Sequence, residues 1–275
     1  MGSACLCYGT AGPRAAPDSS LEVCPIVQAP CPPLKEYYSG ASGRRGGVAG
    51  LFDRTACDYD RVERVMAFGT GSRYRRRALQ RAGLAYGMSV IDVGVGTGLV
   101  AREAARLVAD ASRVTGVDPS PGMVAQAKVP DGVSLIAGRA EAIPLPSACA
   151  DFVSMGYALR HISDLSVAFA EFWRVLRPGG RICLLEITRP AGSLSQVLLK
   201  AYMRGVVPVL AKMVARQAET PQLMRFYWDT IEACVAPQVI MNAIANAGFE
   251  NVMRHVELGI LSEYRACKPR AAAAL

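Results

Sequence analysis

The sequence predicts an α/β protein built on an open, mostly parallel sheet, and three observations support this prediction. Apolar, strand-like segments alternate with amphipathic, helix-like segments between residues 88 and 187. A glycine-rich turn, Gly94-x-Gly96-x-Gly98, joins the first of these strands directly to a helix. The chain has 275 residues and is 51% hydrophobic, which is enough for one sizeable core. In such a sheet a ligand binds at the carboxyl ends of the strands.

The individual elements follow from the period of the apolar residues. We expect parallel strands at 88–93, 113–118, 132–137, 151–157 and 181–187, and a closing antiparallel pair at 251–258 and 260–267. We expect helices at 98–109, 120–128, 164–176 and 238–247. Ser163 is the expected N-terminal cap of the third helix, and Arg177-Pro178-Gly179-Gly180 is expected to form the turn that follows it.

Two further helical regions lie outside this alternation. An apolar stripe that begins near Leu51 predicts a helical cover before the first strand. Residues 193–233 form an insertion, in which the helix predicted at 196–214 places Lys200, Arg204 and Lys212 on one face, with a kink at Pro208. The opposite, apolar face favours a lid that closes over an apolar pocket, with a helix on a membrane surface as the alternative.

Residues 1–45 are rich in Gly, Pro, Ala and Ser and show no sustained period. We therefore expect a disordered extension, with Arg44-Arg45-Gly46-Gly47 as a hinge and a single domain over residues 46–275. No apolar segment of the signal-peptide kind follows the first residues.

The net charge and the cysteine content limit which kinds of binding partner, metal site and location we expect. The net charge is +8, and an arginine cluster, defined as Arg73, Arg75, Arg76, Arg77 and Arg81, suits nucleic acid, an anionic membrane, an acidic substrate or simply solvent. Aromatic residues do not alternate with these arginines as a base-stacking surface would need, so we expect no nucleic acid partner. The nine cysteines include no C-x-x-C pair and there are two histidines, so we expect no metal and a reducing, cytoplasmic location.

The glycine turn and Asp118, an acid downstream of it, limit which class of ligand the site can bind. The spacing is not the dinucleotide pattern G-x-G-x-x-G, in which a pyrophosphate lies on the helix N-terminus. Asp118 ends the next strand and can accept hydrogen bonds from both hydroxyls of a ribose. A ribose acid without a phosphate signature favours a nucleoside without phosphates, of which S-adenosylmethionine is the common one.

Several motifs resemble the ubiquinone/menaquinone biosynthesis C-methyltransferases, a UbiE-like family of class I S-adenosylmethionine-dependent methyltransferases. The most specific runs from Arg174 to Thr188 and is close to the R-V-[aliphatic]-K-P-G-G…E-x-S signature of the family. Residues 158–164, ALRHISD, are similar to a second motif, and the resemblance covers about Phe52 to Pro269. An N-terminal signature matches at Tyr59-Asp60 and Phe68-Gly69 but departs at Glu63, Ala67, Gly71 and Tyr74, which puts the quinone substrate in doubt.

The resemblance implies a Rossmann-like fold: a seven-stranded, mostly parallel sheet with an antiparallel last strand, a helical N-terminal cover and a helical lid insertion. The motifs, the insertion and the expected chemistry together give three sets of candidate site residues. The cofactor-binding set is Asp92, Gly94, Gly96, Thr97, Gly98, Asp118, Pro119, Met123, Arg139, Ala140 and Tyr157. The catalytic set is Arg160, His161 and Glu186, in which His161 is a candidate base and Arg160 a candidate partner of a phenolate. The set that covers the substrate is Tyr59, Tyr74, Leu199 and Tyr202.

We therefore expect a methyltransferase that acts on a small, apolar, aromatic or quinol-like acceptor, with carbon as the favoured methylation site. N- or O-methylation of a lipid or natural product is one alternative, and a non-catalytic scaffold that binds the cofactor is another. Peripheral contact with the inner face of a membrane and a homodimer both stay open.

Overall fold

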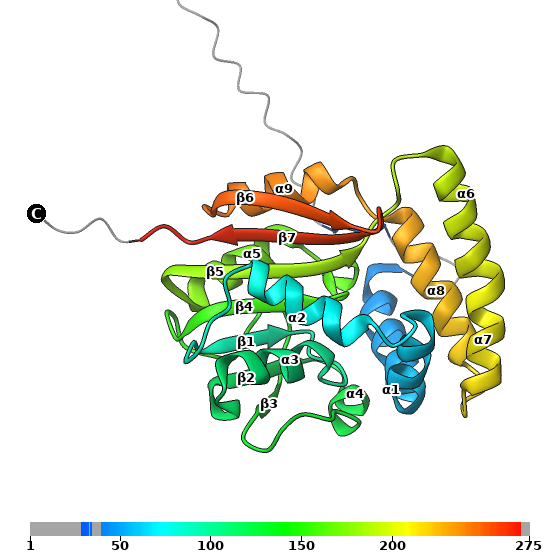
Figure 1. The fold of residues 1–275 in the computed structure, drawn as a ribbon, viewed down its shortest axis with the longest axis horizontal. Helices are drawn as coiled ribbons and strands as arrows, with labels where there is room; N and C mark the ends of the chain where they lie inside the picture. Colours follow the sequence, from blue (N-terminus) through cyan, green and yellow to red (C-terminus); the bar gives the residue numbers. More distant parts are fainter. Residues whose placement is uncertain (1–28, 33, 35–39, 271–275) are drawn as a thin grey trace, which may run out of the picture.

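The computed structural model describes residues 29–32, 34 and 40–270, and Figure 1 shows its fold. A seven-stranded sheet runs in the order β3-β2-β1-β4-β5-β7-β6. The strands are β1 (Val90–Val93), β2 (Val114–Asp118), β3 (Ser134–Ala137), β4 (Ala150–Gly156), β5 (Leu176–Ile187), β6 (Glu250–Glu257) and β7 (Leu261–Cys267). The first five strands are parallel, and β7 pairs antiparallel with both β5 and β6. The predicted fold class is confirmed.

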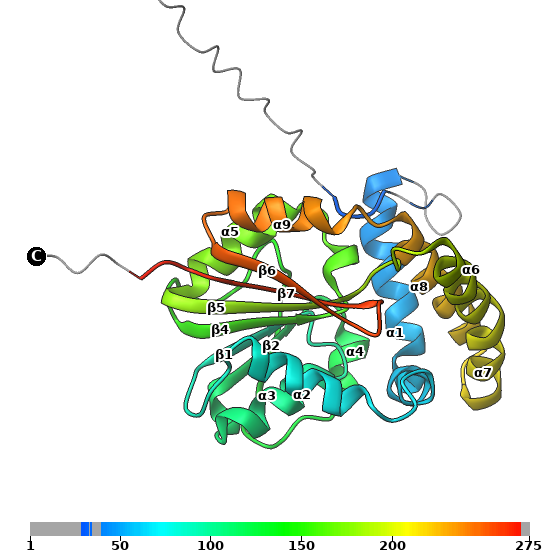
Figure 2. The ribbon, with the colours of Figure 1, turned by 45° about the horizontal axis from the view of Figure 1, so that its top comes forward.

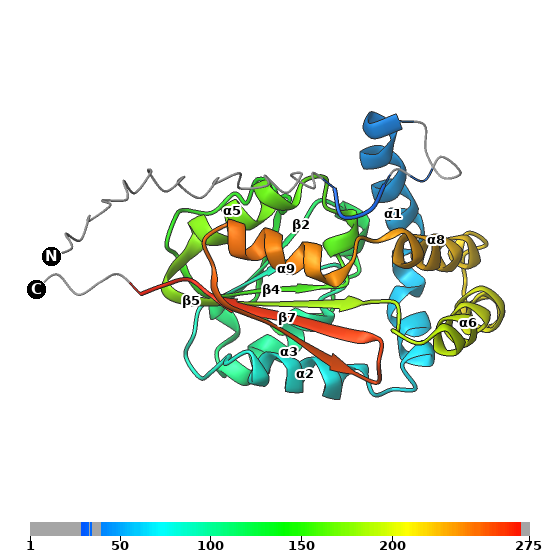
Figure 3. The ribbon, with the colours of Figure 1, turned by 90° about the horizontal axis from the view of Figure 1, so that it is seen from above.

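Helices cover both faces of the sheet (Figure 3). On one face, α2 (Gly71–Arg81) and α3 (Leu99–Val108) pack in an apolar cluster with β1, β2 and β4. On the other face, α5 (Leu165–Val175) and α9 (Pro237–Asn246) pack in a second cluster, which includes Phe169 and Phe172. Because both faces are covered, the central strands are apolar on both sides, as their continuous hydrophobic sequence predicts.

Two local predictions need correction. The cap of α5 is Asp164 rather than Ser163, because its carboxylate accepts hydrogen bonds from the backbone N–H groups of Ser166 and Val167. The residues expected as a turn at 177–180 belong to β5, where the pairing register with β4 shifts between Ala150 and Phe152. Gly179 adopts a positive φ of 80° there, so the extra residues are accommodated as a bulge.

The N-terminal region also differs from the expectation. Most of the extension expected over residues 1–45 lies outside the described residues, but Cys31 is fully buried and the carbonyl oxygen of Pro30 accepts a hydrogen bond from Val235 N–H. Helix α1 (Gly40–Met66) begins before the expected hinge at Arg44–Gly47. Gly46 and Gly47, the glycines of the expected hinge, cost a helix only about 1 kcal/mol each relative to alanine. No proline interrupts residues 40–66, so the helix continues through these two glycines.

The helical cover consists of α1 and the insertion between β5 and α9. The insertion contains α6 (Ser193–Ala201), a π-helical turn (Tyr202–Val206), α7 (Val207–Val214) and α8 (Thr220–Ala233). The π-helical turn directly precedes Pro208, where we predicted a kink, because proline supplies no backbone N–H to the preceding turn. Figures 1 and 2 show α6 and α7 outside α8, on the side of the molecule away from the sheet.

The two faces of α6 and α7 are used differently from the prediction. Lys200 pairs with Glu232 and Arg204 pairs with Asp229, so two of the three residues of the basic face contact α8, whereas Lys212 is exposed. One row of apolar side chains packs against α1 and α8 and includes Met203, Val207 and Ala211. A second apolar set is exposed: Leu194, Val197, Leu198, Val206, Val209 and Met213.

Three carboxylates fix α1 on the rest of the protein. The Asp53 carboxylate accepts hydrogen bonds from Ser120 and Gly122 at the start of α4 (Pro121–Ala125). The Asp60 carboxylate accepts a hydrogen bond from the Thr97 hydroxyl in the glycine turn. Asp58 is buried and accepts from the backbone N–H groups of residues 216 and 217 and from a threonine at 220. Helix α1 is therefore anchored both to the glycine turn and to the insertion.

Candidate functional site

A cavity of about 420 Å³ opens at the carboxyl ends of β1, β2 and β4 and is covered by α1. One side of its wall is the glycine turn with Asp118 and Met123, and the other side is aromatic. Its volume falls in the range of small-molecule sites, and its position is the one expected for a ligand of an open α/β sheet.

The glycine turn contributes Gly94 and Gly96 to this wall, whereas the predicted cofactor residue Gly98 lies outside it. Gly94, Gly96 and Gly98 adopt positive φ angles of 70°, 54° and 85°, a conformation that residues with a side chain rarely adopt. A Cβ atom at Gly96 would lie 3.1 Å from Met123 Cε, across the space that the turn borders. Glycine therefore lets the backbone of the turn and the Met123 thioether face each other with no side chain between them.

Asp118 closes the same end of the cavity. Its Oδ2 accepts a hydrogen bond from Gly96 N–H and its Oδ1 accepts one from Ser120 N–H, each at 2.8 Å. Burial raises the pKa of Asp118, and these two N–H groups oppose that rise. Both oxygens keep further lone pairs, so the carboxylate can still accept two hydroxyl groups from a ligand.

Four more of the predicted cofactor residues lie beside Asp118 in the wall: Pro119, Met123, Arg139 and Ala140. The Met123 side chain is buried, whereas the Arg139 side chain is 40% exposed and lies near the Glu141 carboxylate, with 3.6 Å between Nη2 and Oε2. An apolar thioether opposite polar groups at the rim suits a flat, partly polar ring.

Asp92 lies behind the glycine turn and is not part of the cavity wall. Its Oδ1 accepts a hydrogen bond from the Ser154 hydroxyl at 2.7 Å, while Oδ2 is buried without a hydrogen-bond partner. Burial raises the pKa of Asp92 to about 7, although the Ser154 hydrogen bond works in the opposite direction. The structure thus gives Asp92 a supporting position under the turn rather than direct access to the cavity.

The other side of the cavity is aromatic. His161 stacks on Phe226 with 5.6 Å between ring centroids and meets the edge of Phe52 at 5.3 Å. Phe52 and Tyr59 come from α1, and Tyr157 comes from the residue after β4, where a positive φ of 60° sets the direction of its side chain. Such a φ is strained for a residue with a side chain and is typical of functional sites.

Arg160 and Glu186, two of the three predicted catalytic residues, lie outside the cavity wall. They form a fully buried ion pair at the ends of β4 and β5. The Arg160 Nε donates to the Thr230 hydroxyl at 3.2 Å, and its guanidinium carbon lies 4.3 Å from the ring centroid of Tyr227. Both contacts are with α8, so this pair connects the insertion to the sheet.

Of the four residues predicted to cover the substrate, one lines the cavity and three lie elsewhere. Tyr59 lines the cavity, but Tyr74 is buried in the apolar cluster between α2, α3 and the sheet. Leu199 and Tyr202 pack in the cluster formed by α1, α7 and α8. Because α1 lies between the cavity and the helix at 193–214, the cover over the site is α1.

Sequence reasoning did not identify Phe52, Arg75 or Ser163 as cavity residues. We grouped Arg75 with the arginine cluster, but its side chain is 2% exposed and pairs with Glu63. Arg76 and Arg81 also pair with acids, Glu103 and the Glu257–Glu263 pair respectively, so much of the cluster serves internal ion pairs. The period of α2 could have shown that Arg75 shares a face with the buried Ala78 and Leu79.

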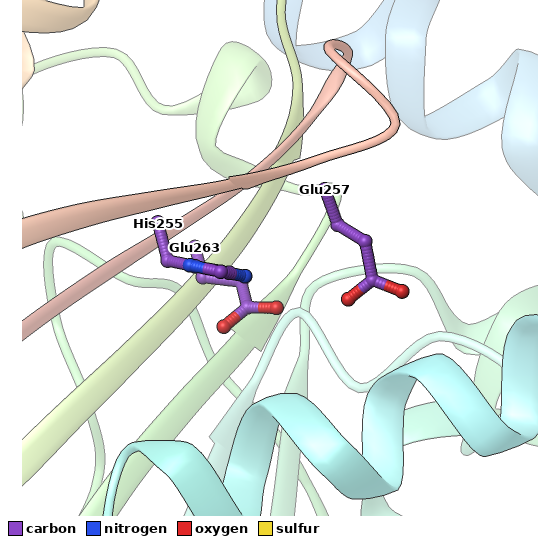
Figure 4. Close-up of side chains that lie close together, drawn as sticks. All are labelled: His255, Glu257 and Glu263. Atoms are coloured by element: carbon purple, nitrogen blue, oxygen red, sulfur yellow. The ribbon is translucent and has the colours of Figure 1, made fainter.

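Away from the cavity, His255, Glu257 and Glu263 bring three titratable side chains together on the β6–β7 hairpin (Figure 4). Arg81, at the end of α2, donates to Glu257 through Nη2 and to Glu263 through Nε, both at 3.0 Å. A guanidinium group therefore already occupies the position where a cation would balance these carboxylates.

Comparisons with known proteins agree with this geometry. The sequence model of the ubiE/COQ5 methyltransferase family matches residues 39–268. A ubiquinone/menaquinone biosynthesis C-methyltransferase UbiE from Syntrophotalea carbinolica is 33% identical over 242 residues, which is 85% of this chain and 97% of the relative. A second UbiE, from Pseudomonas paraeruginosa, is 29% identical over 81% of this chain and 89% of its own.

Solved structures share the fold. A SAM-dependent methyltransferase from Aquifex aeolicus is similar with a TM-score of 0.51 and 20% identity, over 70% of this chain and 88% of its own. Phosphoethanolamine N-methyltransferase 2 from Haemonchus contortus, solved in complex with S-adenosyl-L-methionine, has a TM-score of 0.53 and 18% identity, over 72% of this chain and 53% of its own.

The raised pKa of Asp92 gives a prediction for stability. The unfolded chain loses this proton near pH 3.8 and the folded protein near pH 7, so the contribution of Asp92 to stability is greatest below the first value and is lost as pH rises through the second. Asp92→Asn is neutral at every pH and avoids this loss. Its free energy of unfolding relative to the parent should therefore increase by roughly 1.4 kcal/mol for each pH unit between about pH 4 and about pH 7, and change little above about pH 8.

Urea unfolding across this pH range measures the difference. Asp131→Asn, at an exposed aspartate, is the matched control and should show no such trend. A difference between Asp92→Asn and the parent that stays constant with pH contradicts the prediction.

Proposed function

The chain belongs to the ubiE/COQ5 methyltransferase family, and from this premise we propose that it transfers a methyl group to a carbon atom of a small, apolar, aromatic or quinol-like acceptor. As a member of this family it is an S-adenosylmethionine-dependent methyltransferase. The observation that carries the proposal is the single cavity in which a nucleoside-type end, with the glycine turn and Asp118, adjoins an aromatic end.

The residues of the first end fit S-adenosylmethionine. The side-chain-free space at Gly96 suits a methionine moiety against the backbone, and the Asp118 carboxylate suits the two ribose hydroxyls. Met123, with Arg139 and Ala140 at the rim, suits the adenine ring. When bound, S-adenosylmethionine supplies an electrophilic methyl group on a sulfonium, so the protein needs no nucleophile of its own.

The aromatic end supports an apolar acceptor. Phe52 and Tyr59 lie on α1 and would exclude water from the acceptor, and Tyr157 and His161 would position its ring. The apolar wall also matches the chemistry, because the positive charge of the sulfonium disappears during transfer and a strongly polar pocket would oppose that change. We propose that His161 contacts the acceptor, and that Arg160 and Glu186 act as positioning residues that hold α8 on the sheet.

Measurements of cofactor affinity test whether the end of the cavity at the glycine turn and Asp118 binds S-adenosylmethionine. Asp118→Ala removes two hydrogen bonds between a charged group and the ribose, each of which contributes about 1.5–3 kcal/mol. Gly96→Val places a branched side chain in the ligand space. Calorimetric titration with S-adenosylhomocysteine should show at least about a hundredfold weaker affinity for the first variant and no measurable binding for the second. Asp131→Ala, at an exposed position, should bind like the parent, and unchanged affinity in both site variants overturns the assignment.

The acceptor is tested with methyl-labelled donor. Purified protein is incubated with S-adenosylmethionine that carries ¹³C in its methyl group and with a lipid extract, and the labelled product is analysed by NMR. The proposal predicts a labelled methyl on an aromatic ring carbon. A label on nitrogen or oxygen favours the alternative acceptors, and a protein that binds the cofactor without producing any labelled product would be a scaffold.

We further propose that the exposed apolar side of α6 and α7 contacts a membrane surface, from which an apolar acceptor can enter. Six large apolar side chains are exposed there, from Leu194 to Met213. Residues 188–218 contain five basic residues and no acid. Lys200 and Arg204 pair with acids of α8, so Arg189, Lys212 and Arg216 supply the charge that suits anionic lipid and disfavours a second, equally basic copy of the same surface. In the described part of the chain no helix is long and apolar enough to cross a bilayer, so the contact would be peripheral.

Liposome sedimentation tests this contact. The triple variant Leu198→Ser, Val209→Ser and Met213→Ser loses the apolar area that would enter the interface, so binding to vesicles that contain anionic lipid should fall about tenfold or more. Leu258→Ser, an exposed leucine on the β6–β7 hairpin, is the control and should bind like the parent. A triple variant that changes from dimer to monomer, with unchanged vesicle binding, would show instead that this surface is an interface between copies.

A further inference from the structure

Arg75 differs from every other cation in the cavity wall. Among the described residues that line the cavity, the other arginine, Arg139, has a side chain that is 40% exposed at the rim, whereas Arg75 is 2% exposed. Arg75 lies on α2 and reaches the cavity beside Tyr59 of α1 and Tyr157 at the end of β4. It therefore belongs to the aromatic end of the cavity, apart from the adenosine end at β2 and α4.

The hydrogen bonds of this guanidinium group are incomplete. Its Nη2 donates to Glu63 Oε1 at 2.7 Å, but its Nε is buried without a hydrogen-bond partner. The guanidinium carbon lies 5.6 Å from the ring centroid of Tyr157. A buried donor without a partner is unfavourable in a folded protein, so this guanidinium group, which belongs to a residue of the cavity wall, has the capacity to bind one more acceptor from a ligand.

The surrounding groups indicate an anionic acceptor atom. Among the described residues, Glu63 is the carboxylate that pairs with Arg75, and its side chain is 23% exposed, so water weakens its neutralising effect on the buried cation. Tyr59 and Tyr157 both face Arg75, and burial raises the pKa of each phenol, so neither supplies a negative charge near neutral pH. A planar fork of N–H donors next to aromatic rings is suited to an oxygen anion on an aromatic ligand.

We propose that Arg75 binds the deprotonated hydroxyl oxygen of a phenolic acceptor, and thereby selects acceptors that carry an ionisable hydroxyl group beside the carbon to be methylated. This inference rests on the proposed function and specifies its acceptor. Arg75 would stabilise the phenolate relative to the phenol, and the released proton would pass to solvent. A phenolate is more electron-rich at its ring carbons than the phenol, so the same contact would both orient and activate the acceptor.

The test uses 4-nitrophenol as the probe, because its phenolate form absorbs visible light and its phenol form does not. With the protein saturated with S-adenosylhomocysteine, the apparent pKa of the bound probe should be lower than in solution, which means that the anion binds about tenfold more tightly than the neutral form. Arg75→Met should abolish this preference, and Arg75→Lys should keep part of it. Arg77→Met, an exposed arginine on the same helix, is the control and should behave like the parent.

Glu63→Gln separates a binding role from a structural one. Glutamine can keep the hydrogen bond from Nη2 while it removes the neutralising charge, so this variant should bind the phenolate more tightly than the parent does. A purely structural ion pair would give weaker or unchanged binding. Equal affinity of the parent for phenolate and phenol, or equal effects of Arg75→Met and Arg77→Met, overturns the inference.

The outcome for Arg75 is independent of the outcome for the proposed function. If labelled methyl groups reach an aromatic carbon while probe binding ignores Arg75, the inference fails and the function stands. If phenolate binding requires Arg75 but labelled methyl groups reach only nitrogen or oxygen, carbon methylation fails and the anion site stands.

Discussion

The hydrogen bonds between three carboxylates of α1 and the rest of the protein determine the shape of the site. Asp53 binds the start of α4, Asp60 binds Thr97 in the glycine turn, and Asp58 binds the segment that leads into α8. Without these bonds nothing in the sheet itself would hold Phe52 and Tyr59 over the carboxyl ends of the strands. Burial opposes ionisation of Asp58, but its two backbone N–H donors and Thr220 outweigh that effect and lower its pKa. The anchor at Asp58 therefore stays ionised at neutral pH.

The charged groups around the cavity also differ in how far hydrogen bonds and ion pairs compensate for their burial. Asp92, which has one good partner, has its pKa raised to about 7, whereas the Arg160–Glu186 ion pair is completely buried under α8. Removing one partner of such a buried pair strongly destabilises a protein. Substitutions at Arg160 or Glu186 would therefore disturb the packing of the insertion before they affect methyl transfer. Arg75 lines the cavity whereas Arg160 lies outside its wall, which is why Arg75 and not Arg160 is the candidate for contact with the acceptor.

The sequence was sufficient for the sheet and for the adenosine end of the site because both depend on local signals. The strands and their mostly parallel arrangement follow from alternating strand-like and helix-like segments, and Gly94 to Gly98 with Asp118 are short-range motifs that can be recognised in the sequence itself. The roles of Arg75, Leu199 and Tyr202 depend on which helix packs over which, and helical periodicity alone does not give that. In α6 and α7 the apolar face was predicted to be covered. One apolar row is buried and a second is exposed, because Lys200 and Arg204 form ion pairs with acids of α8.

We propose that one cavity holds the cofactor and the acceptor side by side under α1, with the adenosine at Met123 and Asp118 and the reacting end toward Tyr157 and His161. A crystal structure of the protein with S-adenosylhomocysteine tests this claim most directly. The account predicts that the ribose hydroxyls lie on the Asp118 carboxylate and that the sulfur faces the aromatic end, with space left beside Arg75. An adenine ring seated among Phe52, Tyr157 and His161 would contradict it.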